Sequence, residues 1–299
     1  MDLMEFEKEF STEEQCLAYL LKLRWPNGFV CPRCGVIGKA WPIGDTRYKC
    51  ASCRFMTTVI AGTIFQGTRK PLTLWFRAIW YITSQKHGTS ALGLQKVLGL
   101  GSYETAWTWL HKIRRAMIRP GRDKLQGKIE VDEAYIGSPG EGGKRGRGAE
   151  NKVLVAVAVE INEGIIGRSR MSVISSASSE NLHLFVENTV ESGSTIVTDG
   201  WSGYNGLSDI GYGQEIRKRK SEDDESLLPH VHTVISLLKR WLLGTLQGSC
   251  SKEHFGYYLD EYCFRFNRRK SKSRGMLFYR LLQNAVQLQP STYEDIVKR

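Results

Sequence analysis

The sequence lacks the features of a membrane or secreted protein. No run of about 18 apolar residues occurs in the 299-residue chain, so we expect no transmembrane helix. Its first ten residues, MDLMEFEKEF, are acidic and contain no apolar core of a signal peptide. We therefore expect the protein to remain in the cytoplasm, which in a bacterium also holds the chromosome.

Several common enzyme motifs are also missing. There is no glycine-rich P-loop and no GxSxG sequence. Their absence argues against an ATPase and against a serine hydrolase. No internal repeat and no heptad pattern is visible, so the sequence leaves the oligomeric state open.

Cysteine is scarce, with seven residues, but four of them form two pairs in the pattern C-x2-C-x15-C-x2-C. In a cytoplasmic protein, paired CxxC turns indicate metal binding rather than disulfides. Each turn brings two thiolates to one side, and two such turns close a tetrahedral site with no open position for water. The sequence therefore predicts a structural zinc ribbon that needs the ion to fold. Its ligands would be Cys31, Cys34, Cys50 and Cys53.

Acidic residues are fewer than basic ones, which gives a net charge of +11. A basic balance favours a polyanionic partner, chiefly through phosphate contacts. Five cations lie in or beside the predicted ribbon: Arg33, Lys39, Arg47, Lys49 and Arg54. The ribbon could thus contact DNA, although zinc ribbons also serve as protein-binding modules.

After Pro71 the apolar spacing becomes helical, and a short glycine turn at residues 99–102 joins two of the predicted helices. This arrangement is typical of a helix-turn-helix. The outer face of the second helix, residues 102–118, would carry Tyr103, Glu104, Thr108, His111, Lys112 and Arg115. We predict DNA contacts from Lys112, Arg114 and Arg115. An ordinary amphipathic helix with a solvated basic face explains this stretch equally well.

Near Gly127 the pattern changes to strands. The order is three strands, a helix, a fourth strand, a fifth strand near Ile216 and then helices, which suits an RNase H-like α/β domain. We therefore divide the chain into a helix and zinc ribbon (1–66), a helical DNA-binding segment (67–124) and an RNase H-like domain (125–299).

Two of these strands carry aspartates, Asp132 in IEVDE and Asp199 in TIVTDGW. A carboxylate on an apolar strand is costly unless it is paired or binds a metal. Two such groups on neighbouring strands can share Mg²⁺, as in two-metal nucleases. Taken singly, each is better explained as a turn residue at the end of a strand, but together in this strand order they predict a metal site.

The segments CPRCG, YKCASC, KIEVDEAYIG, VTDGWSGYNGL and LDEYCFRFNRR resemble the IS1595 group of bacterial insertion-sequence transposases, in the DDE superfamily. The resemblance covers nearly the whole chain. It implies DNA strand cleavage and strand transfer on an RNase H-like core with Mg²⁺ or Mn²⁺. The implied partner is double-stranded DNA, as terminal inverted repeats and target, bound by a homo-oligomer associated with the nucleoid.

The resemblance assigns roles to particular residues. Asp132 and Asp199 match the first two catalytic aspartates, Glu133 matches the acidic neighbour of the first, and Lys239 matches a motif lysine, with His232 nearby. The third position departs, because Leu237 stands where asparagine or glutamate is expected, and Leu246 replaces a histidine. Leucine offers no oxygen to a metal. Activity is then lost, or weak activity depends on a substitute such as His232, Asp260 or Glu261. A shifted register would also explain the departure, but the flanking matches argue against it.

Aromatic and basic residues alternate near residues 264–270. We predict DNA contacts from Arg265, Arg268 and Arg269, and from Arg145 in the glycine-rich basic loop 143–148. The alternative is a solvated basic helix end. Three functions therefore compete: an active transposase, a transposase-derived DNA-binding protein without activity, and a zinc-ribbon interaction module on an inactive scaffold.

Overall fold

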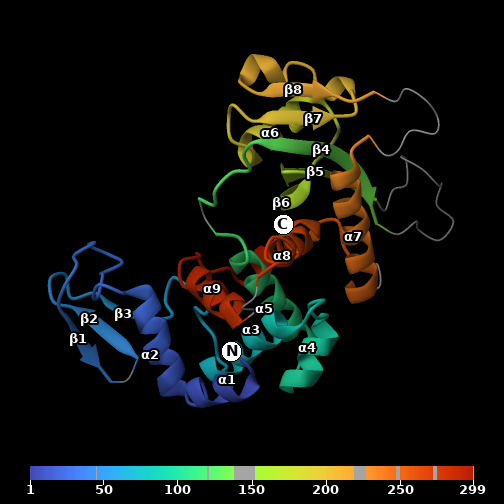
Figure 1. Cartoon of the computed structure of the whole chain (residues 1–299). Coiled ribbons are helices and arrows are strands. Elements are labelled where there is room, and N and C mark those ends of the chain that lie inside the picture. Colours follow the sequence, from blue (N-terminus) through green and yellow to red (C-terminus); the bar gives the residue numbers. More distant parts are fainter. Residues whose placement is uncertain are drawn as a thin grey trace. The chain divides into compact units, whose positions relative to one another are not determined.

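A computed structural model describes residues 1–44, 46–119, 121–137, 152–218, 227–246, 250–271 and 275–298. The chain forms two compact units. Figure 1 shows the whole chain, coloured from blue at the N-terminus to red at the C-terminus. The first unit comprises Met1–Arg119 together with Ser271–Arg299, and the second comprises Pro120–Lys270. No helix in the described part of the chain is both long and apolar enough to cross a membrane.

The first unit is mainly helical. Its helices are α1 (Leu3–Glu9), α2 (Glu13–Arg24), α3 (Leu72–Ser84), α4 (Ala91–Leu98), α5 (Tyr103–Ala116), α9 (Gly275–Ala285) and α10 (Tyr293–Val297). Packing of aromatic rings stabilises the unit, because Phe278 of α9 lies within 6 Å of Phe6, Phe10 and Phe76. This packing differs from the predicted domain division, which assigned residues 271–299 to the α/β domain. The apolar face of α9 is buried against α3 and α5 instead.

Helices α4 and α5 are joined as the sequence predicted. Gly99 ends α4 with φ of 62°, a left-handed conformation in which glycine has no steric penalty. Ser102 then begins α5, and its hydroxyl accepts a hydrogen bond from the backbone N–H of Thr105 at 3.1 Å. The turn between these two caps sets the helix pair.

The ribbon is a small antiparallel sheet with strand order β1-β2-β3. Its strands are β1 (Ala40–Ile43), β2 (Arg47–Cys50) and β3 (Met56–Thr58). One face of this sheet covers a cluster in which Trp25, Phe29, Cys31 and Cys50 are buried. The aromatic rings thus supply the little core that the ribbon has.

The second unit contains a five-stranded sheet of order β6-β5-β4-β7-β8. Its strands are β4 (Lys128–Ile136), β5 (Val153–Asn162), β6 (Ile165–Val173), β7 (Thr195–Thr198) and β8 (Gly213–Ile216). Strands β4, β5 and β6 are antiparallel neighbours, whereas β7 runs parallel to β4 and β8 parallel to β7. Three antiparallel strands followed by two parallel ones, with the first strand in the centre, form an RNase H-like sheet. The predicted fold class is confirmed.

Helices cover both faces of this sheet (Figure 1). Helix α6 (Ser179–Thr189) packs on one face, and α7 (Pro229–Leu246) and α8 (Phe255–Phe266) pack on the other. Strand β5 is apolar throughout because both of its faces are buried. Val155 and Val157 face α7 and α8, while Ala156 and Ala158 face α6. The face under α7 also carries Glu130 and Asp132, which are described below with the acidic site.

Candidate functional site

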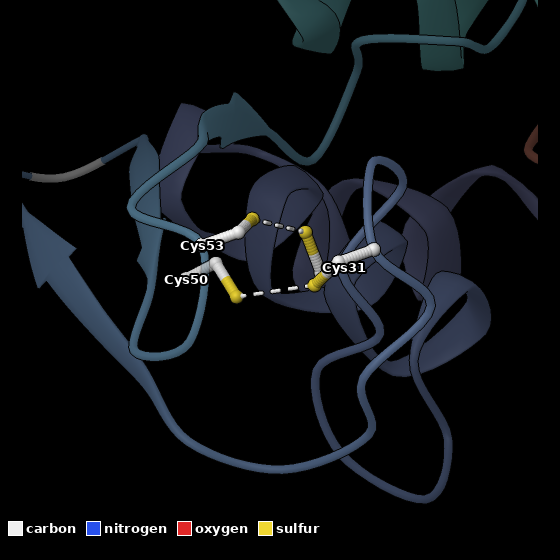
Figure 2. Close-up of side chains that lie close together, drawn as sticks. Cys31, Cys50 and Cys53 are labelled. Atoms are coloured by element: carbon white, nitrogen blue, oxygen red, sulfur yellow. Dashed lines mark hydrogen bonds between the residues drawn. The ribbon is translucent and has the colours of Figure 1, made fainter.

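The four paired cysteines come together in the ribbon. Their sulfur atoms all lie within 4.8 Å of one another. The Sγ atoms of Cys31 and Cys53 are 3.6 Å apart, and those of Cys34 and Cys50 are 3.8 Å apart. Figure 2 shows Cys31, Cys50 and Cys53 with their sulfur atoms turned toward the centre of the cluster. Each pair in contact joins one CxxC turn to the other, as a tetrahedral site requires.

The two turns share one backbone geometry. The N–H of Gly35 donates to the carbonyl of Cys31 at 2.9 Å, and the N–H of Arg54 donates to the carbonyl of Cys50 at 3.1 Å. The two donors also share a left-handed backbone, with φ of 70° at Gly35 and 61° at Arg54. The repeated CxxC spacing thus folds twice into the same turn.

The thiols influence one another electrostatically. Burial raises the pKa of Cys31, but backbone N–H groups at Cys34 and Arg33 and the neighbouring thiols outweigh it and hold that pKa at about 6. The backbone N–H of Val36 lowers the pKa of Cys34, but burial and hydrogen bonds with the neighbouring sulfurs outweigh it and raise that pKa to about 12. Four sulfur donors at this spacing fit zinc, with no position left for a substrate.

The catalytic aspartates predicted from the sequence lie level on neighbouring strands. Glu130 of β4 pairs with Val197 of β7, and these strands are parallel. Asp132 follows Glu130 by two residues and lies on the face that α7 covers, whereas Asp199 follows Val197 by two residues. Asp132 stands within β4, whereas Asp199 directly follows β7.

Asp132 contacts helix α7. Its Oδ2 lies 3.1 Å from Nε2 of His232, and its Oδ1 accepts the backbone N–H of Glu133 at 2.9 Å. Burial raises the pKa of Asp132, His232 lowers it and Asp199 raises it, with a net rise. The two aspartates are therefore close enough to repel one another.

Asp199 is exposed, and its Oδ1 accepts the backbone N–H of Trp201 at 3.0 Å. Among the described residues, only the four cysteines gather three or more possible ligands within 4.8 Å. Asp199 thus turns toward its own loop and does not close onto the Asp132–His232 contact.

A carboxylate that was not predicted from the sequence fixes the start of α7. Glu130 is 0% exposed, and its Oε2 accepts the backbone N–H groups of His230 and Val231, each at 2.9 Å. Its Oε1 lies 2.8 Å from Nδ1 of His230 and accepts Nη1 of Arg217 at 3.3 Å. A negative charge at a helix N-terminus is favourable, because the first N–H groups have no helical partner. The period-two pattern of β4, which places Glu130 on the same face as Asp132, was the available signal.

Glu133 points to the opposite face of the sheet. Its Oε2 accepts the hydroxyl of Tyr204 at 2.7 Å. Burial raises the pKa of Tyr204 well above its ordinary value, and the charge of Glu133 adds to this rise. Tyr204 was not predicted from the sequence.

Helix α7 presents a defined face to Asp132. At about 100° per residue, His232, Ser236 and Lys239 share this face, while Leu237 lies about 140° around the helix from His232. Leu246 packs against the core cluster of this unit. The leucine at 237 therefore lies away from the side that carries His232.

The predicted DNA contacts on α5 need correction. Arg114 is 2% exposed and His111 is 0% exposed, so neither side chain can reach DNA. The physical reason is that α5 packs against α4, α9 and α10, which buries a wider face than the sequence pattern suggests. Lys112 and Arg115 are half-buried, and burial lowers the pKa of Lys112.

The three arginines near residue 267 that were predicted to contact DNA lie in the last turn of α8 and directly after it, and each contacts the protein. Arg265 pairs with buried Glu261 at 2.8 Å, Arg268 stacks over Phe264 at 4.3 Å, and Arg269 donates to the carbonyl of Gly167 at 3.1 Å. These guanidinium groups bind the protein itself. Arg145 and its loop lie outside the described residues.

The two other acids that were considered as a third ligand are engaged elsewhere. Burial raises the pKa of Asp260 to about 6, and its facing charge is Arg122. Glu261 is held by Arg265. Of the three substitutes, His232 is the one that the structure brings into contact with Asp132.

Two family models match the chain, one for each kind of site. A model described as the ISXO2-like transposase domain, the DDE domain of IS1595 elements, matches residues 124–267. A second, the transposase zinc-ribbon domain of the same elements, matches residues 11–55. Together they span more than half of the chain. The chain belongs to the IS1595 transposase family.

One relative of this transposase is described as an uncharacterized protein in transposable element ISH50 of Halobacterium salinarum. It is 28% identical over 280 residues, which covers 86% of this chain and 92% of the relative. Among solved structures, the catalytic core domain of BIV integrase is similar with a TM-score of 0.31 and 15% identity, over 50% of this chain and 86% of that one. The RNase H-like assignment rests on the strand order and directions in the second unit.

Proposed function

We propose that this transposase cleaves DNA at the ends of its element and joins those ends to target DNA, with Asp132, Asp199 and His232 as ligands of Mg²⁺ or Mn²⁺. One observation supports this assignment most directly. His232 reaches Asp132 from α7 at 3.1 Å, and Asp199, directly after the neighbouring strand β7, is close enough to raise the pKa of Asp132. Helix α7 thereby supplies a ligand atom despite the leucine at 237.

The donor types fit such an ion, and holding it would require Asp199 to turn from its own loop toward Asp132 and His232. Carboxylate oxygens suit Mg²⁺ and Mn²⁺, and an imidazole nitrogen favours Mn²⁺ over Mg²⁺. When bound, the ion would activate the attacking oxygen and stabilise charge on phosphate. The chain's own residues position it: Glu130 holds the start of α7, and burial keeps Asp132 in place. Lys239, exposed on the His232 face, is placed to contact a DNA phosphate, and Glu133 positions the strand through Tyr204.

The DNA partner is double-stranded, as terminal inverted repeats and target, and we propose that a homo-oligomer pairs two element ends. The α4–α5 pair contributes Lys112 and Arg115, the half-buried cations of that segment. The ribbon and helical segments (1–66 and 67–124) would recognise the ends, and the RNase H-like part of 125–299 would act on them. Such a protein would work at the nucleoid, in the cytoplasm.

The experiment uses labelled inverted-repeat duplexes, purified full-length protein, and Mn²⁺ or Mg²⁺. We expect nicked and joined products that disappear in Asp132→Ala and Asp199→Ala, while the exposed Asp209→Ala serves as the control. Duplex binding without product in any metal would contradict the proposal. It would favour the second candidate, a DNA-binding protein without activity, which the missing third carboxylate supports.

A further inference from the structure

The ribbon sheet has two faces of different character. Residues paired across antiparallel strands project to the same side. Trp41 pairs with Lys49, and Lys49 with Met56, so these three form one row across the sheet. The register gives a second row on the same side, formed by Ile43, Arg47 and Thr58. We call these two rows the outer face.

The large apolar side chains of the outer face are exposed. Trp41 is 48% exposed, Ile43 is 41% exposed and Met56 is 55% exposed. On the opposite side, Tyr48 and Cys50 pack into the aromatic cluster of the ribbon. The ribbon has little core, yet three of its large apolar side chains are exposed to solvent side by side. Such a cluster of exposed apolar groups indicates a binding surface.

The charge of the outer face is positive. Arg47 and Lys49 belong to it, and the guanidinium of Arg54 lies 5.9 Å from the Trp41 ring centroid. Between Glu14 and Glu104 the sequence contains a single acidic residue, Asp45. An acidic partner surface would therefore meet almost no repulsion around the ribbon.

We propose that the outer face binds a single DNA strand, with Trp41 stacked on an unpaired base and with Arg47 and Lys49 on the phosphates. A cationic surface alone would suit duplex DNA, but a duplex offers mainly phosphates and groove edges to a protein. Exposed aromatic and aliphatic groups between cations suit the flat faces of unpaired bases. This site goes beyond the proposed strand cleavage and does not depend on it.

The test measures binding of the zinc-loaded full-length protein to a labelled 12-nucleotide single strand and to its duplex, by fluorescence anisotropy. We expect Trp41→Ala to weaken single-strand binding at least about fivefold, the lower limit for removing one stacked base. Duplex binding should change less than twofold. Replacing Arg47 and Lys49 together by Ala should lower the salt dependence, by about 0.7 in slope for each phosphate that the variant no longer neutralises.

Ile37→Ala is the matched control, because Ile37 is exposed in the same ribbon but lies outside the outer face. It should leave single-strand binding unchanged. Zinc content, measured for every variant, shows that the ribbon remains folded. Equal weakening in Trp41→Ala and Ile37→Ala, or none in a zinc-loaded Trp41→Ala protein, would overturn the proposal. A Trp41→Ala effect confined to the duplex would overturn the choice of a single strand.

Discussion

His232 contacts Asp132 through Nε2 and Oδ2, 3.1 Å apart, and this contact repeats one that begins two residues earlier in both elements. There Nδ1 of His230 lies 2.8 Å from Oε1 of Glu130. Strand β4 and helix α7 are therefore joined at two successive points. Glu130 in the first joint is fully buried and holds the helix start, whereas Asp132 and His232 in the second joint are two of the proposed metal ligands. We therefore expect the first joint to affect stability and the second to affect strand cleavage.

The contact between His232 and Asp132 predicts which substitution in α7 reduces strand cleavage. His232→Ala should reduce strand cleavage by at least about 100-fold, because it removes the α7 ligand next to Asp132. Leu237→Asn should change cleavage less than about threefold, because position 237 lies about 140° away on the helix. Initial rates of nicking in Mn²⁺ measure both.

Comparison of the two variants decides between two ligand positions. If Leu237→Asn raises cleavage strongly while His232→Ala has no effect, the third ligand position is 237 and the face assigned to α7 is wrong. Circular dichroism of both proteins checks that α7 is intact.

Glu130 predicts a stability effect. Glu130→Ala should lower the free energy of unfolding by about 3 kcal/mol, because it leaves His230, Val231 and Arg217 without their buried acceptor. Glu130→Gln keeps an acceptor oxygen and should cost about half as much. Urea unfolding of the full-length protein gives both values.

The control for this prediction is Glu215→Ala. Glu215 also pairs with Arg217, at 3.2 Å, but it is 41% exposed, so its removal should cost less than about 1 kcal/mol. Equal effects of the Glu130 and Glu215 substitutions would show that burial at Glu130 contributes nothing.

The sequence predicted those features that short-range spacing determines. Two CxxC turns lie in one ribbon because each turn needs only its own four or five residues, and the predicted order of strands and helices after Gly127 is the one observed. It failed where the outcome depended on distant partners. Arg114 and Arg265 have the same charge as a surface arginine, but α5 is covered by helices near the C-terminus and Arg265 is paired with Glu261.

The site around Asp132 was likewise predictable only where neighbouring residues along the chain determine it. The strand pattern predicted an aspartate on or at the end of each of two neighbouring strands, and Asp132 lies within β4 while Asp199 directly follows its neighbour β7. The partner of Asp132 was harder to predict, because His232 comes 100 residues later on a helix whose rotation depends on Glu130. Helical spacing alone could have shown that position 237 and position 232 face different directions.

Loss of zinc should unfold the ribbon and leave the Pro120–Lys270 unit folded. Cys50→Ser, or treatment with a strong chelator, should release about one zinc ion per chain and unfold the ribbon, because the site has four ligands and little core around it. The unfolding transition of the Pro120–Lys270 unit should persist, since its core is its own. Zinc release is measured with a colorimetric chelator and unfolding by calorimetry. Cys250→Ser, outside the cluster, should retain zinc; a zinc-free but fully folded Cys50→Ser ribbon would argue against a structural ion.

The pH dependence of stability should reveal Asp260. Burial raises its pKa to about 6 in the folded protein, against an ordinary value near 4. Below pH ~4 the side chain is protonated in both the folded and unfolded chain and does not oppose folding. Between those values the folded protein keeps a proton that the unfolded chain has lost, so stability falls as pH rises through about 6. Above about pH 6 the full cost of burying the charged carboxylate applies, up to about 3 kcal/mol.

Asp260→Asn removes this cost without changing the shape of the side chain. It should therefore raise Tm by several degrees at pH 8 and leave Tm unchanged at pH 4, whereas exposed Asp209→Asn should show no such difference. A Tm gain of the same size at both pH values would mean that the asparagine acts through packing and not through titration.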